Sequence, residues 1–269
     1  MTGNIFYRVD PLWICLILIC FLVAASEAGY WVIQKRRSRR PETFEKADIA
    51  LILGAVLTLL ALLLGFTYSM SENRFEVRRE LVVQEANAIG TTYLRAQTLS
   101  EPRSSEAQEY LRQYTKLRVE LANTTEITPQ ILLEADRRTK ELHNLLWAQA
   151  VALAKESPTP ITSLYLQTLN EMIDLHTKRL AAFHNRVPLA IYMVLGVVSG
   201  VAVFLVGFYI GFSKHRAHVL TMMLAMLVAS VMWLILDLDQ PASGTIRTSQ
   251  QSLIDLQQDM KLNLSDKAK

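Results

Sequence analysis

The apolar residues of this chain are gathered into four long runs instead of being spread evenly along its 269 residues. The runs cover residues 12–33, 49–70, 188–212 and 219–236. Crossing about 30 Å of hydrocarbon takes about 20 helical residues, so each run is about long enough to span a membrane. A soluble protein would need a much larger body to bury four such helices. The pattern therefore predicts an all-α integral membrane protein with four transmembrane helices.

A different pattern fills residues 71–187, between the second and third runs. Apolar residues recur there at helical spacing, and Pro and Gly are scarce. Ser100, Thr128 and Thr159 each precede a Pro by one or two residues, which is a helix-start signal. We expect a four-helix antiparallel bundle inserted between the second and third spans. Its helices are expected over 71–98, 102–122, 129–155 and 160–187.

The first and last bundle helices adjoin the membrane runs without a linker. Each is expected to continue into its run as one rod, with a kink at Pro188. Gly90 lies in the middle of the first rod, where Gly costs about 1 kcal/mol relative to Ala. We therefore expect another segment to pack tightly against Gly90.

The runs divide the chain into four predicted parts. These are a transmembrane hairpin at 1–70 (spans 12–33 and 49–70, basic loop 34–48), the bundle at 71–187, a second hairpin at 188–238 (spans 188–212 and 219–238) and a tail at 239–269. The tail places Leu253, Leu256 and Met260 at helical spacing, which predicts a short amphipathic helix.

The first run is expected to be a retained span, because its positive cluster follows the apolar stretch, whereas a signal peptide has its positive charge before it. Both cysteines, Cys15 and Cys20, lie inside this run. Their position excludes a disulfide framework and a Cys-x-x-Cys metal site.

The net charge is +3, but the positions of the charged residues along the chain are more informative than this total. Six Lys or Arg residues lie between the first two runs, and Lys214 and Arg216 lie between the last two. Cytoplasmic loops collect Lys and Arg. The pattern therefore predicts that residues 71–187 lie outside the cytoplasm. The cluster at 35–40 is also a candidate site for anionic lipid.

Two spans carry faces of small or polar residues, the kind through which helices associate in lipid. Such faces serve packing within one chain, a subunit contact or the wall of a pore, and the sequence leaves these three open. The candidates in the second span and its extension are Gly54, Thr58, Gly65, Thr67, Ser69 and Asn73. Those in the third span are Gly196, Gly200, Gly207 and Gly211.

Several ionisable residues are candidates for a metal site or for catalysis. Glu171, Asp174 and His176 lack the Glu-x-x-His spacing of bundle metal sites, so we expect no metal. His176 falls on an apolar seam, which predicts a core histidine. Glu85 is expected to form an interhelical ion pair. Glu27 is expected to reach the interface or a partner.

Asp237 and Asp239 end the fourth span. They are interpreted as a helix-end pair, with an acidic ring in an oligomer as the alternative. The sequence has no Gly-rich phosphate loop, no Ser/His/Asp nucleophile arrangement and no nucleic-acid motif. We therefore expect neither an enzyme nor a cofactor nor a nucleic-acid partner.

Several segments resemble the bacterial bestrophin-like domain family of unknown function. They are "RRELVVQEANAIGTTYLRA", "LRQYTKLRVE", "LWAQA", "PTPITSLYLQTLNEMIDLHTKRLAAFHNRVP" and "LILDLDQPASGTIRTSQQSLIDL". The polar and glycine positions within them are Arg78, Arg79, Glu85, Asn87, Gly90, Arg95, Asn170, Glu171, Asp174, Asp237 and Asp239.

The resemblance implies a likeness to bestrophins, which are pentameric anion channels with four spans and a helical domain between the second and third. It therefore implies a homo-oligomer in a lipid bilayer that forms an ion pathway. It also implies a cytoplasmic bundle, opposite to the charge pattern. The alternative function is a membrane-anchored sensing or interaction module whose bundle binds a partner or ligand.

Overall fold

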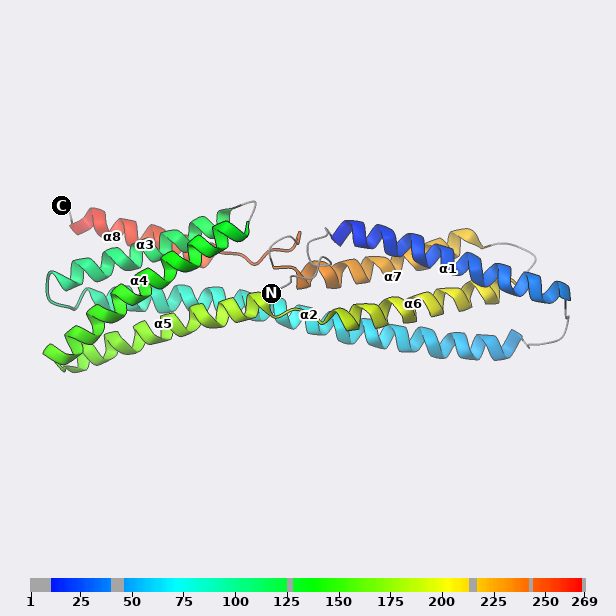
Figure 1. The fold of residues 1–269 in the computed structure, drawn as a ribbon, viewed down its shortest axis with the longest axis horizontal. Coiled ribbons are helices and arrows are strands. Elements are labelled where there is room, and N and C mark those ends of the chain that lie inside the picture. The colour runs from blue at the N-terminus through cyan, green and yellow to red at the C-terminus, as the bar shows by residue number, and fades with distance from the viewer. Residues whose placement is uncertain (1–10, 40–45, 125–127, 213–216, 242–243, 268–269) are drawn as a thin grey trace. The chain divides into compact units, whose positions relative to one another are not determined.

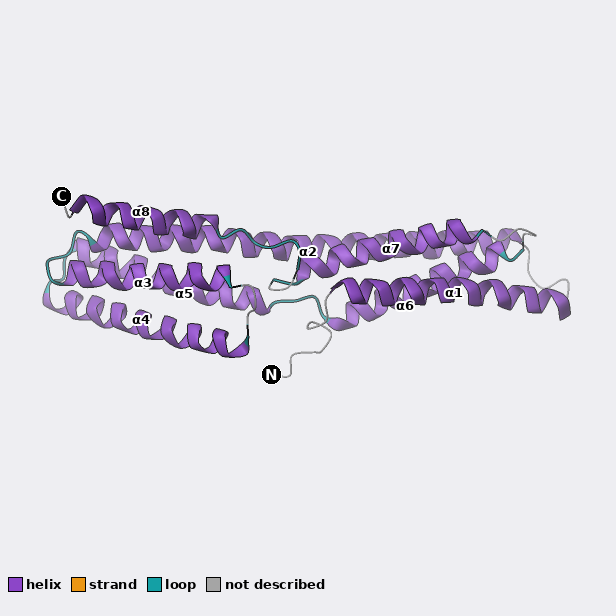
Figure 2. Cartoon of the chain, turned by 90° about the horizontal axis from the view of Figure 1, so that it is seen from above, coloured by secondary structure: helices purple, strands orange, loops and turns teal. Residues whose placement is uncertain are grey.

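The computed structural model describes residues 11–39, 46–124, 128–212, 217–241 and 244–267, and all regular structure in these ranges is helical. Figures 1 and 2 show the helices and their connecting loops. The helices are α1 (Pro11–Arg39), α2 (Lys46–Ala96), α3 (Arg103–Asn123), α4 (Pro129–Glu156), α5 (Pro160–His184), α6 (Leu189–Ile210), α7 (His218–Asp239) and α8 (Gln251–Lys267). Among the described residues, four helical stretches are long and apolar enough to cross a membrane, and they lie within Leu12–Arg36, Lys46–Ala96, Pro160–Ile210 and His218–Asp239.

The chain forms two compact units. The transmembrane unit consists of Met1–Phe75 and Arg186–Arg247, and the bundle unit of Glu76–Asn185 and Thr248–Lys269. These units follow packing, whereas the four parts predicted from the sequence follow chain order. The four-part division stays a prediction.

The first helix is longer than the apolar run that predicted it. α1 continues to Arg39, six residues past Ile33, through the sequence QKRRSR. Lys, Arg and Gln are good helix formers, so the chain has no reason to leave the helix where its hydrophobicity ends. The predicted loop 34–48 is therefore partly helical. Its residues 40–45, and Lys214 and Arg216 in the last short loop, lie outside the described residues.

A continuous helix was expected at each of the two junctions, and the structure has one at the first junction only. α2 runs without interruption for 51 residues. At the second junction α5 ends at His184 and α6 begins at Leu189, so the expectation of one rod is wrong there. Pro188 has no N–H and disfavours helical backbone in the residue before it. The Val187 N–H instead donates to the Asp239 carboxylate at 3.0 and 3.1 Å.

Two of the three expected helix starts carry a side-chain cap. Thr128 Oγ1 accepts from the Ile131 N–H at 3.3 Å, and Thr159 forms a capping box with Thr162. The third start differs, because Pro102 is the N-cap residue of α3 and makes no side-chain cap. There the carboxylate of Glu101 accepts from the backbone N–H of Ser105 at 3.2 Å.

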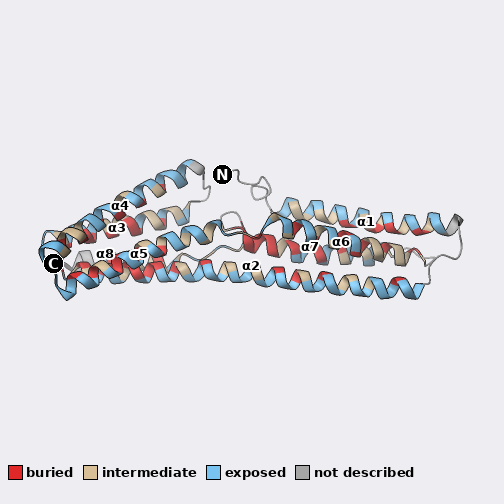
Figure 3. Cartoon of the chain, turned by 60° about the horizontal axis from the view of Figure 1, so that its bottom comes forward, coloured by how far each residue is buried: buried red, intermediate tan, exposed pale blue. Residues whose placement is uncertain are grey.

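The core of the bundle unit is built from one face of each of its helices, drawn red in Figure 3. Tyr114, Tyr165, Leu169 and Met172 are fully buried in it. The segment expected to pack against the glycine in the middle of the first rod is α8. Leu256 Cδ1 would lie 3.2 Å from a Cβ added to Gly90, so the absence of a side chain there lets the C-terminal helix approach α2.

The transmembrane unit holds α1 against α6 and α7. Glycines make this approach close: a Cβ at Gly207 would overlap the backbone carbonyl of Ser26, and one at Gly29 would overlap that of Phe204. Small residues that let two helix backbones touch are the usual means of helix association in lipid, where hydrophobic burial supplies no driving force. Gly200, Gly207 and Gly211 on the small face of α6 therefore serve packing within the chain.

We predict that Gly207→Ala destabilises the transmembrane unit by about 1–3 kcal/mol, because the added methyl group forces α1 and α6 apart. The matched control is Gly196→Ala in the same helix, where a Cβ meets nothing within 4 Å. This control should leave stability unchanged or raise it by up to about 1 kcal/mol through helix propensity. Melting temperatures of the detergent-purified variants test the pair. Equal temperatures for both would contradict close α1–α6 packing at Gly207.

Candidate functional site

Glu85 of α2 lies in the centre of the bundle unit with none of its surface exposed. Its carboxylate accepts hydrogen bonds from the Tyr114 hydroxyl at 2.5 Å and from the Arg179 guanidinium. Arg118 Nε lies 3.5 Å away, and His176 Nδ1 lies 3.8 Å away. Since Tyr114 and Arg118 belong to α3 while Arg179 and His176 belong to α5, one carboxylate joins three helices. The interhelical ion pair expected for Glu85 is present.

The charges of this cluster follow from its burial and its neighbours. Burial by itself raises the pKa of Glu85, but Arg118, His176, Arg179 and Tyr114 outweigh it and hold that pKa well below its usual range. Burial and the Glu85 charge raise the pKa of Tyr114 well above its ordinary value. Near neutral pH the cluster therefore contains an ionised carboxylate, a neutral phenol and guanidinium groups.

The sequence pointed to Glu85 but not to its partners. Tyr114 and Arg118 lie four residues apart, so they share one helix face, and that spacing was the available signal. Arg179 looked like one of several charges near the end of a helix. Which of these charges meets Glu85 depends on the register of the three helices, and this is a property of their packing.

His176 is largely buried, as expected, but beside charges instead of within an apolar seam. Its ring lies 6.3 Å from that of Tyr114 and 5.3 Å from that of His143 on α4. Burial lowers the pKa of His143 to about 4, so its ring is neutral at physiological pH. In the part of the chain that the structure describes, no three His, Cys, Asp or Glu residues are placed to hold a metal ion.

The other resemblance residues of the bundle unit lie in separate places. Arg79 pairs with Glu76 at the surface, and Asn87 and Glu171 are exposed. Arg95 donates to the Leu164 carbonyl at 2.6 Å, Asn170 donates to Asp174 at 3.2 Å, and Arg78 is buried. These residues have different partners on several helices, so the described contacts do not join them into one site.

Asp237 and Asp239 are both 1% exposed, and their carboxylates accept hydrogen bonds from backbone N–H groups. Asp237 accepts from the N–H groups of Thr245 and Ile246 at 2.7 and 2.9 Å and from the Thr245 hydroxyl at 2.8 Å. Asp239 accepts from the Val187 N–H and, at 3.3 Å, from the Tyr192 hydroxyl. Their oxygens are thus occupied within the chain, which favours the helix-end interpretation over an acidic ring.

Glu27 has a partner inside the transmembrane unit. His218 Nδ1 lies 2.9 Å from Glu27 Oε1, which links the start of α7 to α1. The partner expected for this acidic residue is therefore a residue of the same chain.

The face of α2 within the transmembrane unit differs from that of α6, because much of it remains exposed. A Cβ added at Gly54 or Gly65 meets nothing within 4 Å. Thr58, Ser69 and Asn73 are also exposed and, at about 100° per residue, fall on the same side of the helix. We call these five residues the α2 stripe.

Thr67 does not belong to this stripe, which corrects the grouping made from the sequence. It is 4% exposed, and its hydroxyl donates to the Leu63 carbonyl at 2.8 Å. Two residues beyond Gly65, at about 100° each, it lies on the opposite side of α2. Gly200 and Gly211 likewise pack inside the chain, against Phe21 and Ile33, whereas Gly196 has no close neighbour.

We predict that Glu85→Ala destabilises the bundle unit by about 3–5 kcal/mol, because Arg118 and Arg179 are then left buried without their counter-charge. The matched control is Glu76→Ala on the same helix, whose carboxylate pairs with Arg79 at the surface and should change stability by less than about 1 kcal/mol. Thermal unfolding followed by circular dichroism measures both. Similar losses for the two variants would show that the Glu85 pairs do not stabilise the bundle.

Comparison with known proteins agrees with this architecture. The structure is similar to those of a bacterial bestrophin homologue from Klebsiella pneumoniae. A variant with tryptophan replaced by alanine gives a TM-score of 0.67 at 18% identity, covering 99% of this chain and 98% of that one. A leucine-to-threonine variant gives 0.66 at 19% identity, covering 94% and 98%.

A third solved structure, a proline-to-alanine variant of a membrane protein, gives a TM-score of 0.65 at 18% identity, covering 94% of this chain and 97% of that one. A search of curated proteins gave no match. The family model of the bestrophin-like domain matches residues 20–253. On the strength of that match over most of its length, the chain belongs to the bestrophin-like domain family.

Proposed function

We propose that this protein assembles with copies of itself and that its α2 helices line a pathway for ions across the membrane. The observation that carries the proposal is the exposed α2 stripe in the transmembrane unit. Gly54 and Gly65 leave room beside the helix, and Ser69 and Asn73 offer exposed polar groups near the end of an apolar run. Polar groups in a membrane-length helix favour a water-filled path or a partner helix over lipid.

The contrast between α2 and α6 supports this assignment. On α6, close contacts with α1 are made by the small residues Gly200, Gly207 and Gly211. The α2 stripe has no such contact within the described chain, and Figure 3 shows most of the membrane-length part of α2 exposed. Membership in the bestrophin-like domain family supports a channel-type function for the surface that remains.

The charge of the permeating ion depends on one further residue. Glu72 is exposed and follows Gly65 by seven residues, which returns it to the stripe side of α2. A ring of carboxylates in an oligomer favours cations, whereas the likeness to bestrophins implies anions. Chloride preference would mean that Glu72 lies outside the pathway. Sodium preference that is lost in Glu72→Gln would place it inside.

We predict that Gly65→Trp lowers ion flux by tenfold or more, because the indole fills the space beside the stripe. The measurement is chloride and sodium flux into liposomes that contain the purified protein. The matched control is Leu59→Trp, at a position that is 49% exposed and, six residues earlier, lies about 120° around the helix. Its flux should stay within about twofold of the parent protein, well below the tenfold effect that corresponds to about 1.4 kcal/mol.

Two results would count against the pathway. Absence of flux from folded, reconstituted parent protein would oppose ion conduction itself. Loss of flux in Leu59→Trp with full flux in Gly65→Trp would keep conduction but remove it from the α2 stripe.

We further propose that the protein resides in the bacterial inner membrane with its bundle unit in the cytoplasm. Family membership favours this placement over the one expected from the charge pattern, since the positive-inside rule is counted over short loops and 71–187 is long. With Cys15 and Cys20 replaced by Ala, Ser105→Cys at an exposed position of α3 is expected to react with a membrane-impermeant thiol reagent only after cell lysis. Labelling of intact cells would restore the placement predicted from charge.

A further inference from the structure

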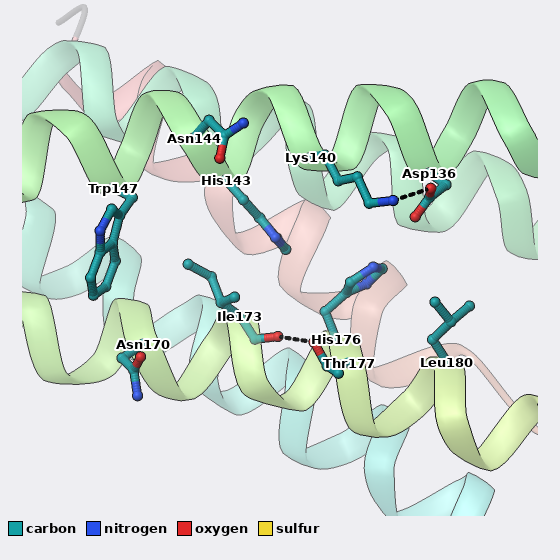
Figure 4. A pocket seen from close by; sticks show the side chains of 10 residues that line it. All are labelled: Asp136, Lys140, His143, Asn144, Trp147, Asn170, Ile173, His176, Thr177 and Leu180. Atoms are coloured by element: carbon teal, nitrogen blue, oxygen red, sulfur yellow. Dashed lines mark hydrogen bonds and ion pairs between the residues drawn. The ribbon is translucent and has the colours of Figure 1, made fainter.

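A pocket lies between α4 and α5, entirely within the bundle unit. Its volume is about 520 Å³, within the range of about 300–1,000 Å³ that small-molecule sites occupy. Figure 4 shows that His143 and Trp147 reach into it from α4, and Ile173 and His176 from α5. The pocket thus combines two imidazoles, an indole and aliphatic side chains.

His143 brings to this pocket a buried polar atom that lacks a hydrogen-bond partner. His143 is 7% exposed, and among the described residues its Nε2 makes no hydrogen bond. The ring is held in place by edge contacts with Tyr114 at 4.9 Å and His176 at 5.3 Å between ring centres. Leaving a buried donor or acceptor unpaired costs about 1–3 kcal/mol. A ligand that hydrogen-bonds this nitrogen would recover that cost.

The charges that line the pocket are already compensated. Lys140 Nζ lies 2.7 Å from Asp136 Oδ2 on the same helix, and His176 faces the Glu85 carboxylate. His143 is neutral because its burial disfavours the protonated form. A charged ligand would have to leave water without an unpaired countercharge to meet it, so the lining favours an uncharged ligand.

The remaining wall is apolar and partly open. Trp147 is 39% exposed and Leu180 is 44% exposed, although both are large apolar side chains that gain by being covered. An aromatic ring fits such a wall best, because ring pairs gain about 0.5–1.5 kcal/mol beyond the area that they bury.

From these contacts we infer that the pocket between α4 and α5 binds a small, uncharged aromatic molecule that carries a hydrogen-bonding ring nitrogen or hydroxyl group. Its ring packs on Trp147, and its polar atom bonds to His143 Nε2. The site is separate from the α2 stripe, and its existence does not depend on ion conduction.

The test uses the full chain in nanodiscs and indazole as the probe, because indazole is a planar, uncharged ring system with one N–H and one acceptor nitrogen. Saturation-transfer NMR and calorimetry, corrected with empty nanodiscs, should give saturable binding with a Kd on the order of 100 µM. Benzoate, a charged ring of similar size, should bind at least tenfold more weakly.

Two substitutions assign the binding to this pocket. His143→Leu removes the hydrogen-bonding nitrogen and Trp147→Ala removes the indole, and each should weaken indazole binding tenfold or more. The control Glu134→Gln changes a largely exposed residue of α4 that does not line the pocket, and it should bind like the parent protein. Trp147 is partly exposed, so its variant keeps the test valid even if His143→Leu fails to fold.

The inference is overturned by any of three results. These are absence of saturable indazole binding to folded parent protein, equal affinity for benzoate, and unchanged indazole affinity in Trp147→Ala. Since none of these measurements involves ion flux, they separate this site from the proposed pathway.

Discussion

The bundle unit depends on neutralising one buried carboxylate. Glu85 has no contact with solvent, so its charge must be met by groups brought from other helices. Arg118 from α3 and Arg179 from α5 supply that charge, and Tyr114 supplies a hydrogen bond. Burial of this kind constrains the relative positions of three helices, because a shift in register would leave a charge unpaired. The same fixed geometry also positions His143 and His176 beside the pocket between α4 and α5.

The helices of the transmembrane unit are held together by different interactions from those of the bundle unit. Hydrophobic burial cannot hold helices together in lipid, so close glycine contacts join α1 to α6. The irregular backbone near the ends of α6 and α7 still needs hydrogen-bond partners, and Asp237 and Asp239 provide them. In the part of the chain that the structure describes, the residues of the α2 stripe remain exposed.

Elements whose cause is local could be predicted from the sequence. The four apolar runs, the caps at Thr128 and Thr159 and the helical content each depend on a few neighbouring residues or on a 3.6-residue period. Helix ends with weak local signals were less well predicted, as at Arg39 and His184. At the first, charged residues simply continue a helix, and at the second, Pro188 and a distant carboxylate together end one.

The sequence by itself therefore determined the four apolar helices, the helical content and the family, because periodicity, run length and local motifs carry that information. Only the tertiary structure decided which cations meet Glu85 and that Leu256 covers Gly90. It also decided that Gly200, Gly207 and Gly211 of α6 pack against α1, whereas Gly54 and Gly65 of α2 have no close neighbour. Each of these depends on the rotation and register of helices that are far apart in the chain. Neither quantity is fixed by spacing along one helix, since several faces of similar composition compete and packing selects among them.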